Sequence, residues 1–93
     1  MTSTLLPFRP GAVGAVEQEM LAAFEDGATT VVLDLDGLDM LDANGVRALI
    51  SLLRRARAAG GELALHAVKP EVLRTLSVTA LDRIFPVVEE RAA

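Results

Sequence analysis

Four aspartates fall within the stretch 34–42 of this chain: Asp34, Asp36, Asp39 and Asp42. Carboxylate oxygens are the ligands that hard cations such as Mg²⁺ and Ca²⁺ prefer, so such a cluster could hold a metal ion. The spacing does not match the loop of an EF-hand, however, and leucines and a methionine stand between the aspartates. We therefore expect no metal site and no cofactor here, and we expect the aspartates to belong to a polar loop.

The first two aspartates also follow an apolar run, in the segment Val31-Val32-Leu33-Asp34-Leu35-Asp36-Gly37. This segment resembles the opening motif of the haloacid dehalogenase phosphatases, which implies a nucleophilic Asp34, a general acid at Asp36 and a bound Mg²⁺. Leu38 stands where that family usually has Thr or Val, and no acidic pair follows the only lysine, Lys69, on a strand end. We expect no catalytic residue and no enzyme activity. A degenerate Asp-x-Asp phosphatase is the alternative from another functional class.

The segment Asp42-Ala43-Asn44-Gly45 is typical of a helix start, with Asp42 or Asn44 as the capping residue. The free N–H groups of such an end can hold an anion, but an ordinary capped helix explains the motif equally well. Three arginines in the stretch 54–57 fall near the expected end of this helix, where the helix dipole favours positive charge. The lone His66 has no second His or Cys beside it, so we interpret it as structural.

Helical and strand-like patterns alternate along the chain, with Gly and Pro between them. They predict a short strand at residues 5–8, a helix over 12–25, a strand over 29–35, a helix over 42–59, a strand over 62–67, a helix from Pro70, and a turn and short strand over 81–88. Pro7 restricts the first strand to a sheet edge or a bulge, and the end at 89–93 should be frayed. The apolar spacing predicts that Ile50 lies in the core stripe of the helix over 42–59, and that Val72, Leu73 and Leu76 of the next helix face inward. This order predicts an α/β fold with a small mixed or mostly parallel sheet of three to four strands and three to four helices.

The amino-acid composition argues against several classes of function. A length of 93 residues allows one domain, 1–93, and a hydrophobic fraction of 52% can supply its core. The net charge of −4 and the absence of Trp and Tyr argue against binding to nucleic acid or to an anionic membrane surface. No Cys, no membrane-length apolar run and no signal-peptide pattern occur, so the expected location is the cytoplasm.

Two longer segments carry a more specific signal. The first lies between Val31 and Leu63 and consists of Val31–Leu35, Leu41–Leu49 and Ala59–Leu63. The second is the tail Leu76–Phe85. Together they resemble the STAS domains of anti-sigma factor antagonists over roughly residues 12 to 88. The resemblance implies a STAS-like fold and binding to an anti-sigma factor that is also a serine kinase. In that family the kinase phosphorylates a Ser or Thr directly after the motif's Asp, and the added charge breaks the complex.

The chain departs from that pattern at three places. Ala43 and Asn44 follow Asp42, so the phosphoacceptor-equivalent position has no hydroxyl. The chain has room for about one strand before the first helix, where the family usually has two, which leaves a sheet edge less covered and favours a homodimer. Ala80 stands where the family commonly has Gly.

We therefore expect a phosphorylation-independent protein-interaction module in transcription regulation or signalling, with an anti-sigma factor kinase as the expected partner. A subunit of a signalling scaffold or of a lipid-transport complex is the alternative among binding modules. The expected contact surface combines the loop from Asp36 to Asn44 with an exposed helix side, flanked by Ala48 and Leu52. Its residues are Asp36, Asp39, Asp42, Ala43, Asn44, Arg47, Ser51 and Arg54.

Overall fold

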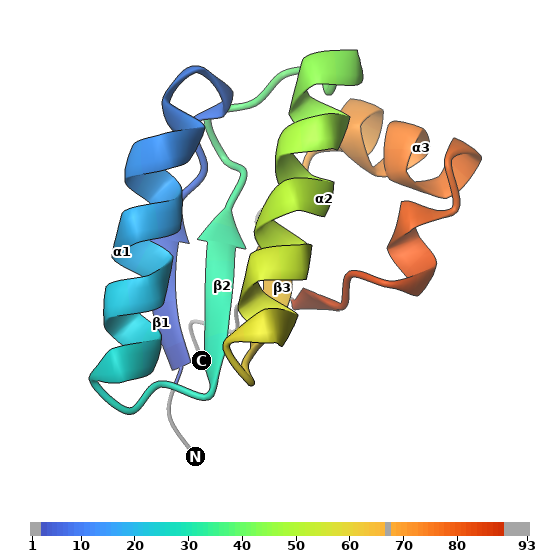
Figure 1. The fold of residues 1–93 in the computed structure, drawn as a ribbon. Coiled ribbons are helices and arrows are strands. Elements are labelled where there is room, and N and C mark those ends of the chain that lie inside the picture. Colours follow the sequence, from blue (N-terminus) through green and yellow to red (C-terminus); the bar gives the residue numbers. More distant parts are fainter. Residues whose placement is uncertain (1–2, 67, 89–93) are drawn as a thin grey trace, which may run out of the picture.

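The computed structural model describes residues 3–66 and 68–88, which form four strands, three α-helices and two short 3-10 helices (Figure 1). The expected frayed segment 89–93 lies outside these residues. In chain order the elements are β1 (Ser3–Pro7), η1 (Pro10–Ala12), α1 (Val13–Glu25), β2 (Thr30–Asp34), α2 (Ala43–Ala58), β3 (Glu62–His66), α3 (Pro70–Val78), η2 (Leu81–Arg83) and β4 (Val87–Val88). The predicted α/β order is thus confirmed.

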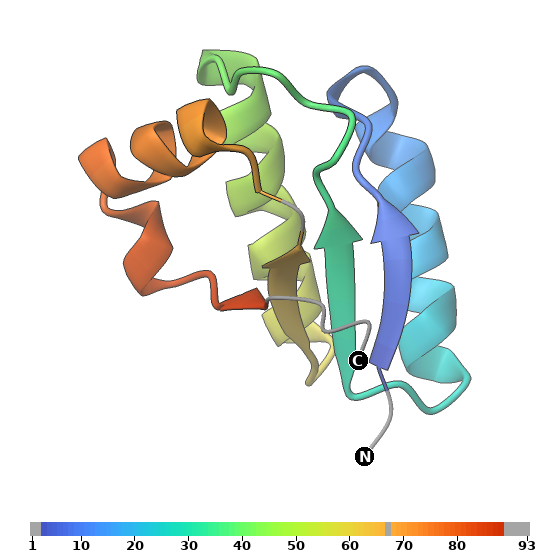
Figure 2. The same cartoon turned by 180° about the vertical axis from the view of Figure 1, so that it is seen from behind.

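The four strands form one fully parallel sheet in the order β1-β2-β3-β4. Helices α1 and α2 cover one face of this sheet, with α1 over β1 and β2 and α2 over β3. Seen from behind, the opposite face of β1, β2 and β3 carries no helix among the described residues (Figure 2). Pro7 ends the outermost strand, β1, which agrees with its predicted place at a sheet edge.

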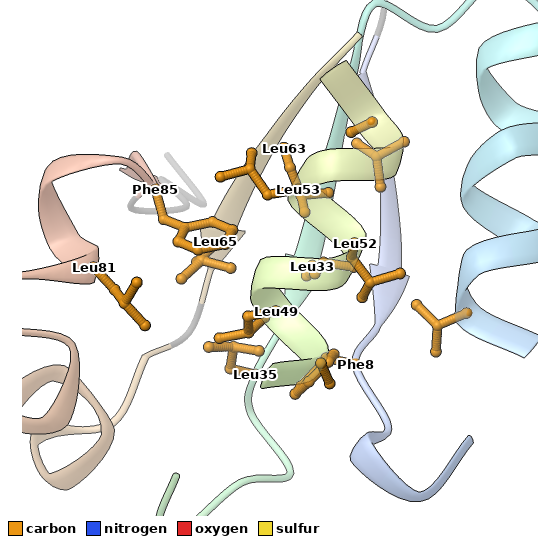
Figure 3. Packing of buried hydrophobic residues seen from close by; sticks show 14 of the residues in the cluster. Phe8, Leu33, Leu35, Leu49, Leu52, Leu53, Leu63, Leu65, Leu81 and Phe85 are labelled. Carbon is orange, nitrogen blue, oxygen red and sulfur yellow. The ribbon is translucent and has the colours of Figure 1, made fainter. Parts of the chain in front are cut away.

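The core lies between the helical layer and the sheet. Val31, Leu33 and Leu35 are fully buried, because alternate residues of a strand point to the same face. The leucines of α2 lie among those of β2 and β3, and Phe85 and Leu81 belong to the same cluster (Figure 3). Burying this much apolar surface in so small a domain is what offsets the entropy of ordering the chain.

Helices α1 and α2 end in the same way. Gly27 and Gly60 adopt positive φ angles of 108° and 83° directly after their helices. At each end, two backbone N–H groups donate back to carbonyls of the last turn, as Gly60 N does to Arg57 O and Gly61 N to Ala56 O. This is the Schellman arrangement, which glycine adopts without strain. It directs the chain from each helix straight into the next strand.

Two side chains are oriented differently from the prediction. Leu73, expected to face inward, is 43% exposed, whereas Val72 and Leu76 are fully buried as expected. Ile50, expected in the core stripe of α2, is half-buried and packs against the core, whereas Leu52, expected beside the exposed side, is fully buried. In both helices the buried stripe therefore differs from the predicted one at single positions. No helix of the described ranges has both the length and the apolar content needed to cross a bilayer.

Candidate functional site

The candidate site begins where β2 ends, at the carboxyl edge of the sheet. The Asp34 carboxylate accepts a hydrogen bond from Asp36 N at 2.9 Å, and Leu38 N donates to Leu35 O at 2.9 Å. These bonds close a tight turn directly after the strand, in the way that aspartate side chains commonly do. Asp34 therefore has a structural role, and the chain leaves the sheet at a fixed angle.

The start of α2 is capped by Asp42. Its backbone is extended (φ −95°, ψ −175°) and its carboxylate accepts from Gly45 N at 2.9 Å. The first helical bond, from Val46 N to Asp42 O, is also 2.9 Å. Of the two capping residues predicted from the sequence, Asp42 is the one that caps the helix. Such a cap stabilises a helix by about 1 kcal/mol and leaves Ala43 as its first residue.

A close approach fixes the loop from the other side. Gly45 is buried, and a Cβ atom built on it would lie 2.6 Å from Leu41 Cδ1. Leu41 itself is only 6% exposed and packs in the core. The segment is thus held at Leu41, Asp42 and Gly45, while Ala43 and Asn44 remain exposed. A short exposed stretch on a rigid support is the usual form of a recognition site.

An ion pair ties the middle of the loop to the start of α3. Lys69 Nζ donates to Asp39 Oδ1 at 2.8 Å. This hydrogen bond lowers the pKa of the Asp39 carboxyl and raises the pKa of the Lys69 ammonium. Asp39 is exposed and Lys69 is half-buried, so the pair is accessible to water and orients the loop more than it stabilises the fold.

The outer face of α2 continues the exposed surface away from the loop. Arg47, Ser51 and Arg54 are exposed at positions i, i+4 and i+7 of the helix. With Ile50 and Arg55 they line a shallow hollow of about 450 Å³. Arg55 also lies 3.5 Å from a carboxylate oxygen of a glutamate in α1. The structure therefore offers a basic stripe with one apolar side chain beside it.

Comparison with known proteins assigns the fold. The profile of the STAS domain matches residues 11–93. The chain belongs to the STAS domain family. Over 78 residues it is 35% identical to BtrV of Bordetella bronchiseptica, which is named an anti-sigma factor antagonist; the match covers 84% of this chain and 67% of that relative.

Solved structures support the same fold. An RsbS variant from Moorella thermoacetica has a TM-score of 0.74 at 23% identity, over 98% of this chain and 84% of that one. An anti-sigma-factor antagonist domain protein from Planctomyces limnophilus has a TM-score of 0.69 at 24% identity, over 94% and 82%. At these identities the likeness concerns the fold of the STAS domain, as the sequence resemblance implied.

Within this STAS domain the expected contact residues are all exposed, along the loop and on the helix that follows it. Asp36, Asp39, Asp42, Ala43 and Asn44 are all exposed along the loop, and the arginine stripe follows on the same helix that Asp42 caps. The flanking pair was predicted wrongly: Ala48 and Leu52 are 6% and 0% exposed. They fall on the side of α2 that packs on the sheet, because buried positions recur at three- and four-residue steps.

One exposed residue of the loop was missed in the sequence. Met40 is 69% exposed, between Asp39 and the buried Leu41. An exposed methionine offers a flexible apolar contact and is over-represented at binding surfaces. The sequence shows three apolar residues around Asp39, namely Leu38, Met40 and Leu41, but it does not reveal which of them faces outward.

The described residues give no support to a metal centre. Within the ranges 3–66 and 68–88, no three acidic or histidine side chains come together as a metal-binding group. His66 Nδ1 lies 3.2 Å from Val88 O, a contact that joins β3 to β4. Asp34, Asp42 and His66 thus serve a turn, a helix cap and a strand contact.

Proposed function

We propose that this STAS domain binds a protein partner through the loop Asp36–Asn44 and the adjoining outer face of α2. The expected partner class is an anti-sigma factor with kinase activity in the cytoplasm, on the analogy of the relatives named anti-sigma factor antagonists. The proposal is supported by a loop held from three points that presents Met40 and Ala43 to solvent. A rigid surface loses little entropy on binding.

The observation that carries the regulatory part of this proposal is Ala43. It is the first residue of α2, exposed, and directly follows the capping Asp42. The family resemblance assigns the phosphoacceptor hydroxyl to this position, and alanine has none. Ser51 lies eight residues further along α2, about 12 Å away at 1.5 Å per residue. Binding through this loop is therefore independent of phosphorylation at the usual place.

The charges of this surface indicate which groups a partner surface should carry. Asp36 and Asp42 are exposed at the loop, and Arg47 and Arg54 at the helix, with Met40 as an apolar contact. A matching partner surface carries basic groups opposite the loop, acidic groups opposite the stripe and an apolar pocket for the methionine. Such charge patterns contribute mainly to specificity and association rate, while the apolar contact contributes more to affinity.

The decisive test is the variant Ala43→Glu. A carboxylate in the first turn of α2 is mildly favourable to the helix, so the domain should fold normally. In a partner interface the same charge must lose its water beside Asp42. Affinity for a partner isolated from the native cell by pull-down should therefore fall about a hundredfold, measured by titration calorimetry.

The matched control is Ala43→Ser, which adds only a hydroxyl and should bind nearly as well as the wild type. Phosphopeptide mapping after incubation with a kinase partner should find phosphate at position 43 of this variant only. Full affinity of a folded Ala43→Glu domain would show that the loop is not the contact surface. Phosphate on Ser51 of the wild type would show that the phosphorylation site has moved along the helix.

The phosphatase alternative has a simple test of its own. In the structure Asp34 Oδ1 accepts the Asp36 N–H and so closes the turn after β2, a structural role. We expect no Mg²⁺-dependent hydrolysis of p-nitrophenyl phosphate above background, and no change on Asp34→Asn. A magnesium-dependent turnover that Asp34→Asn abolishes would establish an enzyme and overturn the binding proposal.

A further inference from the structure

The outer edge of β1 is an unpaired strand edge of the described sheet. Phe8 N donates to Asp34 O. Alternate residues of a strand direct their backbone N–H and C=O groups to the same side, so those of Thr4 and Leu6 also point toward β2. Ser3, Leu5 and Pro7 consequently direct theirs away from the sheet. No described residue pairs with this side of β1. The family match begins only at residue 11 and does not include the strand.

An exposed apolar side chain and a hollow lie at this edge of β1. Leu5 is 56% exposed and lies beside Val32 on the helix-free face of the sheet. On the helical face, a hollow of about 350 Å³ runs between α1 and the edge. It is lined by Thr4, Glu19, Ala22, Ala23, Asp26 and Ala28. Mostly short side chains there leave room for a second layer of structure to approach.

We propose that β1 pairs antiparallel with β1 of a second copy of this chain, with Leu5 opposite Leu5 on the two-fold axis. In this register each Leu5 N–H donates to the Leu5 carbonyl of the other copy. Ser3 N–H donates to the carbonyl of Pro7 in the other copy. Pro7 has no N–H to give, so each Ser3–Pro7 pair is joined by one bond instead of two, and the Ser3 carbonyl is left to water. The two Leu5 side chains then cover each other on the helix-free face.

The charges at the two ends of the edge fit the same arrangement. Arg9 follows the C-terminal end of β1 and holds Glu19 only loosely, at 3.7 Å. Asp26 follows α1, whose C-terminal end lies beside the N-terminal end of β1 (Figure 1). Antiparallel pairing puts opposite ends of the strand side by side. It therefore brings Arg9 of each copy next to Asp26 of the other, and this self-complementarity argues for a second copy over an unrelated strand.

The strand register can be tested with a substitution that leaves the hydrogen bonds between β1 and β2 in place. Leu5→Pro removes only an N–H that points away from β2, so every bond between β1 and β2 is retained. By sedimentation equilibrium, the wild type should show a reversible dimer, and Leu5→Pro should raise its dissociation constant about tenfold or more. In the wild type, the Leu5 amide should exchange with deuterium more slowly as the protein concentration rises, because pairing protects it.

A charge exchange gives an independent readout should Leu5→Pro unfold the strand. Arg9→Asp and Asp26→Arg should each weaken the dimer about threefold, as expected for exposed ion pairs, and the double variant should restore it. A double variant as weak as the single ones would rule out the antiparallel register. A wild type that remains monomeric at about millimolar concentration, or a Leu5→Pro domain that dimerises equally well, would overturn the proposal.

Discussion

Ala80 has a backbone conformation that its side chain disfavours. With φ 62° and ψ 15° it is left-handed, and it is the one residue other than glycine with positive φ among those described. The strain is kept because Ala80 N donates to Ser77 O and Ala80 O accepts from Arg83 N, which links α3 to η2. We expect Ala80→Gly to raise the free energy of unfolding by about 0.5–1 kcal/mol.

Thermal unfolding followed by circular dichroism should show this gain as a rise in Tm of about 3–6 °C. The matched control is Ala58→Gly, the same substitution at an exposed residue in the last turn of α2. Glycine there should lower stability by up to about 1 kcal/mol, since the backbone is already helical. A lowered Tm for Ala80→Gly would mean that the left-handed conformation costs nothing in this protein.

At the scale of elements, the Lys69–Asp39 pair joins the candidate loop to α3 and has a calculable pH dependence. The pKa of Asp39 is lowered from 3.8, so its contribution is complete above that pH and is lost as the pH falls through the lowered value. The pKa of Lys69 is raised from 10.5, so its contribution is complete below that pH and is lost as the pH rises through the raised value.

The difference in Tm between the wild type and Lys69→Met should therefore be small and constant from about pH 5 to about pH 9. It should shrink outside that window, as one partner loses its charge. Arg74→Met is the control, because Arg74 is exposed in α3 and no ion pair to it is found among the described residues. A difference that changes between these pH values would point to a titrating partner other than Asp39.

The elements themselves were largely predictable, and the reasons are local. Pro7, the β-branched run at 30–32 and Pro70 each act within a few residues of their own position, so β1, β2 and α3 begin and end close to the predicted places. The rotation of a helix about its axis is not local. Whether Ile50 or Leu52 faces the sheet depends on where α2 lies over β3, and both residues are apolar.

The candidate site shows the same limit. Asp42 was identifiable as a cap because capping follows from residue type and position. The Asp39–Lys69 contact joins residues thirty positions apart and depends on the packing of α3. Met40 was hidden because exposure within an apolar run is decided by the tertiary fold, which also buries Leu41. A local pattern can thus name the loop but not the side chains that it presents.

At the scale of the whole molecule, the two proposed surfaces occupy different sides. Helix α2 lies over β3, and the loop joins the end of β2 to the start of this helix. The open edge of β1 lies at the other end of the strand order, on the side where α1 packs (Figure 1). A dimer built on β1 therefore leaves both copies of the loop accessible, and each chain retains its own partner site.

This separation predicts that dimerisation and partner binding are independent in energy. Titration calorimetry should give one partner per chain for both the wild type and Leu5→Pro, with Kd values equal within about twofold, because distant sites without shared contacts act additively. Ala43→Glu should weaken partner binding while leaving the dimerisation constant unchanged. A Leu5→Pro domain that remains folded but loses the partner would show that the edge of β1 belongs to the partner site. A partner that dissociates the wild-type dimer would likewise place both contacts on one surface, contrary to the strand order of the sheet.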